Sequence, residues 1–225
     1  MVANADVLNE VPPSETEHYR REAMGAFAHE VRTPLTSIRM VMELARRQSS
    51  AGQLLLDSEL AEMLSASVDD LQRLADDLQE TSRLERGKLS LSPGPCNLHA
   101  AIEAARDFAS KDLSFEGDPP TGVEGPWDAA RLVRSISGFV EAANRIGDGS
   151  GVVRLACFPH DCDVEIRFES GSRGNVRDGV AADAGFAFFR SRQFVLAMGG
   201  SVDCERSERY ARITVSLPLR RGEEG

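Results

Sequence analysis

Apolar side chains recur in steps of three and four over two stretches in the N-terminal third of the chain. This spacing places them on one face of an α-helix, so each stretch is predicted to be an amphipathic helix. The seam of the first helix consists of Phe27, Val31, Leu35, Ile38, Met42 and Ala45. The seam of the second helix consists of Leu60, Leu64, Ser67, Leu71, Leu74 and Leu78, in the alternation of a heptad pattern.

Polar and small residues mark the ends of these two helices. Ser14 and Glu17 form a capping-box pattern at the expected start of the first helix. Residues 49–52 supply a turn, and the second helix is expected over Leu54–Glu85, where Gly87 ends it. The chain is therefore predicted to form a helical hairpin.

A single hairpin buries two apolar seams poorly, whereas two hairpins can combine into a four-helix bundle. We therefore predict a homodimer formed through residues 14–87. The alternative is that the apolar face packs against the C-terminal half of the same chain.

Helix and strand patterns mix in the remainder of the chain, after a short strand and linker expected over Lys88–Pro95. The expected helices are Leu98–Ser110, Asp128–Ile146 and Ala184–Met198. The expected strands are Asp112–Glu116, Val152–Phe158, Val164–Glu169, Val202–Cys204 and Ala211–Leu217, with a hairpin turn at His160–Asp163. This order predicts an α+β protein whose C-terminal half is an α/β sandwich with a mostly antiparallel sheet. The expected organisation is a flexible segment 1–13, a helical domain 14–87 and an α/β domain 88–225.

Composition narrows the classes of partner. The chain has 225 residues and a formal net charge of −10, which argues against nucleic acid or an anionic membrane surface. It has no apolar run near the roughly 20 residues needed to span a bilayer, and no signal-peptide core. Its four cysteines lack CxxC spacing, so neither a metal site nor a disulfide is expected. These features predict a cytoplasmic protein.

The segment Ala26–Ile38, with the sequence AFAHEVRTPLTSI, carries the candidate chemistry. His29 lies two residues from both Phe27 and Val31, which places it roughly opposite the seam at about 100° per residue. It is therefore expected to face solvent. An exposed imidazole titrates near neutral pH and can offer a free nitrogen lone pair as a nucleophile towards phosphorus. Glu30 can accept a hydrogen bond or a proton from the other ring nitrogen.

The pattern His-Glu-x-x-Thr-Pro-Leu over residues 29–35 resembles the H-box of two-component sensor histidine kinases. The resemblance implies that His29 is a phosphoacceptor in a dimeric helical domain. It also implies that the partner is the receiver domain of a response regulator, which brings its own magnesium.

Further residues of the first helix acquire roles from this resemblance. Thr33, one turn after His29, is placed to orient a water against an incoming phosphoaspartate. Pro34 leaves the carbonyl of Glu30 without its helical partner, yet the seam continues in phase beyond it, so the helix is expected to run through. The expected docking surface for the receiver extends the His29 face at helical spacing and consists of Arg32, Thr36 and Met40.

The C-terminal half resembles the ATP-binding domain that follows the phosphoacceptor domain in histidine kinases. The order of elements fits, but the nucleotide motifs do not. Gly138 and Ala142 stand where the family has two asparagines, the second of which helps to bind magnesium, and Glu141 lies beside them.

The two glycine boxes of the family also diverge. The first corresponds to Glu169-Ser170-Gly171-Ser172-Arg173, with a longer carboxylate at the adenine position and an arginine in place of a glycine. The second corresponds to Gly185-Phe186-Ala187-Phe188, where bulky rings are expected to obstruct the approach of phosphates to backbone amides. Glu141, Glu169, Gly171 and Gly185 are thus expected to be remnants of a site that no longer binds ATP.

The sequence therefore predicts a pseudokinase-type histidine phosphotransferase in a phosphorelay. His29 would exchange a phosphoryl group with a receiver aspartate or accept one from an upstream kinase, and the chain would need no cofactor of its own. Three alternatives remain: an ATP- and magnesium-dependent sensor histidine kinase with divergent motifs, a phosphatase that uses Glu30 and Thr33, and a non-enzymatic scaffold.

Overall fold

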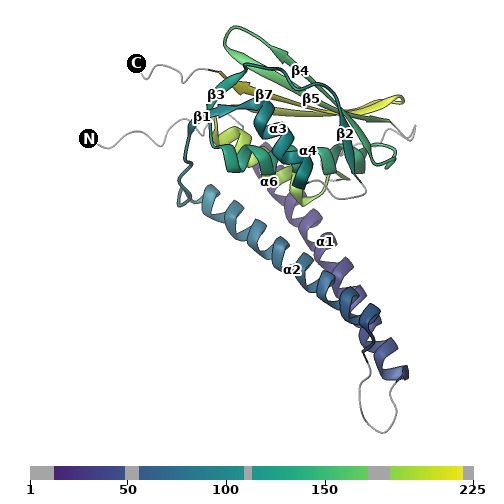
Figure 1. The fold of residues 1–225 in the computed structure, drawn as a ribbon. Helices are drawn as coiled ribbons and strands as arrows, with labels where there is room; N and C mark the ends of the chain where they lie inside the picture. Colours follow the sequence, from purple (N-terminus) through teal and green to yellow (C-terminus); the bar gives the residue numbers. More distant parts are fainter. Residues whose placement is uncertain (1–12, 49–55, 109–112, 172–182, 220–225) are drawn as a thin grey trace.

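Two long helices form a hairpin that projects from an α/β domain (Figure 1). The computed structural model describes residues 13–48, 56–108, 113–171 and 183–219. Helix α1 spans Pro13–Gln48 and helix α2 spans Ser58–Glu85. The predicted turn at 49–52 and the N-terminal segment before Pro13 lie outside the described residues.

The helix ends follow local chemistry, but both helices begin away from their expected starts, and α2 begins at Ser58 and not at Leu54. Helix α1 begins at Pro13, so Ser14 lies inside the helix and not at a cap. Helix α2 is capped by Asp57, whose carboxylate accepts the backbone N–H of Leu60 at 2.9 Å. Gly87 follows α2 with a φ of 62°, the left-handed conformation that ends helices. Pro34 is buried within α1, which confirms that the helix continues through it.

The two helices bury only part of their apolar seams against each other. Val41 and Ala45 of α1 pack with Leu60 of α2, and all three are buried. Leu35, however, keeps 51% of its surface exposed, and Val68 of α2 keeps 50%. One hairpin therefore leaves apolar surface uncovered, which is unusual for a helix face with no further partner.

A five-stranded sheet forms one layer of the α/β domain, with the strand order β2-β4-β5-β7-β6. Its strands are β2 (Ser114–Glu116), β4 (Val152–Pro159), β5 (Asp163–Gly171), β6 (Ser201–Arg206) and β7 (Tyr210–Pro218). Only the β2–β4 pair is parallel, which confirms the predicted, mostly antiparallel sheet. The turn between β4 and β5 is closed by the N–H of His160, which donates to the carbonyl of Asp163.

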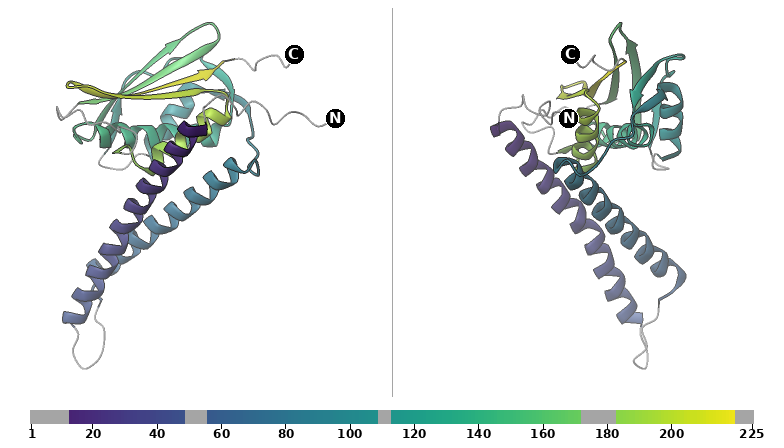
Figure 2. Two further views of the ribbon diagram at one scale, coloured as in Figure 1. Left: turned by 180° about the vertical axis from the view of Figure 1, so that it is seen from behind. Right: turned by 90° about the vertical axis from the view of Figure 1, so that its left-hand side faces the viewer.

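Three helices cover one face of this sheet, as Figure 2 shows. They are α3 (Leu98–Phe108), α4 (Ala129–Ile146) and α6 (Phe186–Ala197). Side chains of β5 alternate between buried and half-buried, and Ile166 and Phe168 point into the core beside Phe139 of α4. No described helix is both long and apolar enough to cross a membrane.

A second sheet of two short strands was not predicted as such. It pairs β1 (Gly94–Asn97) with β3 (Glu124–Trp127). The strand expected over Lys88–Pro95 thus begins later, and β3 was missed because a four-residue run with a proline carries little periodicity. Trp127 is fully buried, and its Nε1–H donates to the carbonyl of Pro218 at 2.8 Å.

An ionic cluster joins the hairpin to the α/β domain. Asp77 of α2 is 2% exposed and pairs with two guanidinium groups, those of Arg134 on α4 (2.6 Å) and Arg190 on α6. Arg134 also pairs with Glu80 at 2.6 Å, and Glu80 lies 3.5 Å from Arg131. The interface partly desolvates both guanidinium groups, and the negative charge of Asp77 balances their positive charge there.

We expect Asp77→Ala to lower the free energy of unfolding by about 3–5 kcal/mol, because removal of one partner leaves a buried charge uncompensated. Urea denaturation followed by circular dichroism measures this. Asp70→Ala is the matched control, since Asp70 pairs with Arg73 on the exposed side of the same helix and should cost less than about 1 kcal/mol. Equal losses for the two variants would show that the cluster does not hold the domains together.

Candidate functional site

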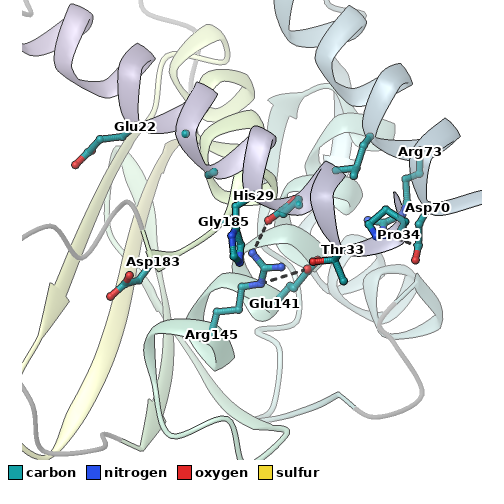
Figure 3. A pocket seen from close by; sticks show the side chains of 14 residues that line it. Glu22, His29, Thr33, Pro34, Asp70, Arg73, Glu141, Arg145, Asp183 and Gly185 are labelled. Atoms are coloured by element: carbon teal, nitrogen blue, oxygen red, sulfur yellow. Dashed lines mark hydrogen bonds and ion pairs between the residues drawn. The ribbon is translucent and has the colours of Figure 1, made fainter. Parts of the chain in front are cut away.

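His29 borders a cavity of about 720 Å³ at the junction of the hairpin and the α/β domain (Figure 3). The side chain is exposed, as the helical periodicity predicts. Residues from both helices of the hairpin and from the α/β domain line the cavity. Among them are Thr33 and Pro34 of α1, Asp70 and Arg73 of α2, Glu141 and Arg145 of α4, and Gly185 just before α6.

Glu30 does not contact His29 in the way the sequence suggested. Its Oε1 accepts hydrogen bonds from Nη1 of Arg145 and from the backbone N–H of Phe186, the latter at 3.0 Å. The Glu30 side chain is only 13% exposed. Within the described part of the chain, the His29 ring makes no hydrogen bond. In this structure the Glu30 carboxylate therefore bonds a guanidinium and a backbone amide and not the His29 ring.

Gly185 allows this arrangement. Its φ of 84° lies in the left-handed region, and a Cβ at this position would overlap both the Arg145 guanidinium and the Glu30 carboxylate. The ring of Phe186 turns away and packs edge-on against Phe27 of α1, with centroids 5.2 Å apart. The prediction that the Phe186 ring blocks the backbone amide was thus wrong, since the N–H donates to the carboxylate of Glu30, which lines the cavity.

Neither of the two positions of the expected asparagines carries a side chain that could bind a metal. A Cβ on Gly138 would overlap Oγ of Ser191, because α6 packs closely on α4 at this point. Ala142 is fully buried. Glu141 lies 3.8 Å from Arg145, and no group of three or more carboxylate, histidine or cysteine side chains among the described residues is arranged to hold a metal.

Glu169 and Gly171 are not part of this cavity. Strand alternation places Glu169 on the open face of the sheet, where its Oε2 pairs with Nη2 of Arg212 at 2.7 Å. Its assignment to an adenine position was therefore wrong, because the inward side chain at this strand end is the buried Ser170. Arg173 lies outside the described residues.

The space beside Gly171 is filled by Asp148. A Cβ on Gly171 would overlap the Asp148 carboxylate. A hydrogen bond from the backbone N–H of Ser150 holds the pKa of Asp148 below its usual range. This carboxylate is thus charged at neutral pH, next to the strand end that the family resemblance assigns to adenine.

Two cations of the cavity were missed in the sequence. Arg145 lies one turn beyond Glu141 and three residues after Ala142. Helical spacing therefore could have placed it on the same face of α4 as the two expected asparagines. Arg73 gave no such signal, because it reaches the cavity only through the angle at which α2 meets the α/β domain. The expected docking residues Arg32, Thr36 and Met40 are all exposed on α1, and none of them lines the cavity.

Comparisons with known proteins agree with this arrangement. Residues 19–87 match the family model described as the His Kinase A (phospho-acceptor) domain. The chain is 27% identical over 165 residues to the signal transduction histidine-protein kinase BaeS of Escherichia coli, which covers 71% of the chain and 34% of BaeS. It is also 27% identical over 221 residues to the probable sensor histidine kinase TcrY of Mycobacterium tuberculosis, which covers 88% of the chain and 46% of TcrY. The chain thus spans a third to a half of the length of these relatives.

Two solved structures share the fold. The histidine kinase AdeS of Acinetobacter baumannii superposes with a TM-score of 0.66 and 17% identity, covering 85% of this chain and 98% of AdeS. Full-length ShkA in complex with AMPPNP superposes with a TM-score of 0.57 and 20% identity, covering 90% of this chain and 46% of ShkA.

These relatives contradict the interpretation of the chain as a histidine phosphotransferase. They are sensor histidine kinases, and their similarity extends over both the hairpin and the α/β domain, which supports the kinase alternative instead. With an H-box histidine at the junction of the hairpin and the α/β domain, residues 19–87 form a His Kinase A (phospho-acceptor) domain, and the chain as a whole is similar to two-component sensor histidine kinases.

Proposed function

We propose that this chain is the catalytic core of an ATP-dependent sensor histidine kinase, with His29 as the phosphoacceptor. The observation that carries the proposal is the position of His29. An exposed imidazole borders a cavity that is also lined by Arg145 and by Glu30, whose carboxylate accepts the backbone N–H at the start of α6. Cations and helix N-termini are the groups that hold phosphates in proteins.

The phosphate end of this cavity fits a nucleotide. Arg145 and the N–H of Phe186 already bind an anionic oxygen, that of the Glu30 carboxylate, which stands in for a phosphate oxygen. Ala142 offers no side-chain ligand for magnesium, so this site diverges from the family pattern at the metal. A bound nucleoside triphosphate would supply the γ-phosphoryl group.

The residues of the chain then have distinct tasks. An unprotonated ring nitrogen of His29 would form the new N–P bond as the bond from the γ-phosphorus to the β–γ bridging oxygen breaks and ADP leaves, while Arg145 neutralises charge on the transferred group. The second ring nitrogen loses its proton, and Glu30 is the adjacent carboxylate that can take it. Thr33 lines the same cavity one turn further on, where its hydroxyl can orient a water for hydrolysis of receiver phosphoaspartate.

The proposed partners are a receiver domain and a second copy of the chain. The receiver accepts the phosphoryl group on an aspartate and rests on Arg32, Thr36 and Met40, which continue the exposed face of α1 beyond His29. The second copy covers the apolar surface that Leu35 and Val68 leave open, which completes a four-helix bundle.

His29→Ala should abolish labelling of the protein by γ-³²P-ATP, because His29 is the only histidine that borders the cavity among the residues the structure describes. Gel autoradiography with acid-labile, base-stable label measures this. His160→Ala, in the exposed β4–β5 turn, is the control and should label normally. Labelling of the His29→Ala variant at wild-type level would refute the phosphoacceptor assignment.

Thr36→Arg combined with Met40→Glu should slow transfer from phosphorylated His29 to a cognate receiver by roughly tenfold or more, since both side chains are expected at the centre of the docking surface. Rapid-quench kinetics measures the transfer rate. Met24→Glu changes an equally exposed methionine of α1 and should transfer normally. Unchanged transfer by the double variant would place the receiver elsewhere.

Leu35→Asp combined with Val68→Asp should convert the protein to a monomer, because covering a leucine contributes up to about 1.5–3 kcal/mol and a buried unpaired carboxylate is costly. Light scattering at micromolar concentration measures the mass. Ser65→Asp, at an exposed polar position of α2, is the control. A monomeric wild type would refute the dimer.

A further inference from the structure

We propose that Glu30 is an internal plug of the phosphate end of the cavity, which a bound nucleotide must displace. This inference rests on the proposed function, because it concerns the same site. In the plugged state, the carboxylate uses both donors that a phosphate would need. Displacement frees that carboxylate directly beside His29, so arrival of the phosphoryl donor would release the base.

The contacts of Glu30 show that its carboxylate is held specifically in this site and is not one half of an exposed surface ion pair. One carboxylate oxygen accepts from a guanidinium on α4 and from the first amide of α6, two elements far from Glu30 in sequence. The side chain is 13% exposed, although its neighbour His29 is exposed. Gly185 leaves room for both groups at a position where any Cβ would overlap them.

Apolar contacts hold the helix that carries the plug. Phe27, three residues before Glu30, packs against Phe186, and Tyr19 lies 4.2 Å below the guanidinium of Arg192. Residues 19, 23, 26 and 30 recur at helical spacing, and the first three pack on the core of the α/β domain. The face of α1 that meets α6 is therefore continuous, with Glu30 as its polar end.

The plug can leave without movement of that helix. A glutamate side chain has three rotatable bonds, so the carboxylate can turn from Arg145 towards His29 while Phe27 stays in place. A triphosphate carries several negative charges against the single charge of the carboxylate and can therefore compete for the same cation. The competition is between two anions for one pair of donors.

Glu30→Gln tests the plug by binding, not by turnover. The amide keeps the size of the side chain and loses the charge, so we expect Mg-ATP and Mg-ADP to bind at least about tenfold more tightly than to the wild type, as measured by calorimetry. Asp76→Asn is the control, because it removes an exposed carboxylate of α2 that bonds Gln72 and does not line the cavity, and it should change the affinity less than about threefold. Arg145→Gln should weaken nucleotide binding.

Hydrogen exchange of the Phe186 amide is the second measurement. In the free protein, Glu30→Gln should speed this exchange by at least about tenfold, since the acceptor becomes weaker, and added nucleotide should restore protection. Equal nucleotide affinities of wild type and Glu30→Gln, with binding to both, would overturn the plug alone. Failure of nucleotide to bind either protein, together with no labelling of His29, would overturn the plug and the proposed kinase activity together.

Discussion

The buried carboxylate of Asp77 fixes the geometry on which the site depends. It binds guanidinium groups from α4 and α6 at once, so α2 meets the α/β domain at one angle and one register. Salt bridges of this kind contribute little net stability relative to apolar packing, but mismatched alternatives leave a charge unpaired in the interface. The cluster therefore selects one orientation of the hairpin, and this orientation brings His29 and Arg73 to the same cavity as Arg145.

The sequence predicted the helices and strands whose apolar side chains recur at a regular spacing. Helix α4 was expected with Asp128 at its start, and Asp128 is its N-cap, with its carboxylate 3.2 Å from the N–H of Arg131. The strands β4, β5 and β7 were located because branched and aromatic residues alternate along them. In contrast, β3 has four residues, one of which is proline, and its partner strand lies nearly thirty positions away. Pairing at that distance leaves no local trace.

The candidate site was predictable in part, for a related reason. His29, Thr33 and Pro34 are neighbours on one helix, so the spacing alone places them together. The partner of Glu30 lies 115 positions away on α4, and only the docking of two domains creates that contact. The error over Phe186 has the same origin, because the direction of its ring depends on Phe27 in a different domain. Residue types at a motif thus identified the chemistry, while orientation came from packing.

Helix α1 has a mechanical property that follows from its continuity. One continuous helix carries Tyr19, Phe27 and His29 and runs on through Pro34 to the end of the hairpin, so a rotation of its N-terminal part about the helix axis would move all three side chains together. An α-helix turns by about 100° and rises about 1.5 Å per residue. A rotation of α1 about its axis by a fraction of this angle, applied at the N-terminal end of the helix, would separate Phe27 from Phe186 and Glu30 from Arg145 in a single motion. Rotation of the helix that bears the nucleophile would thereby release its contacts with the α/β domain.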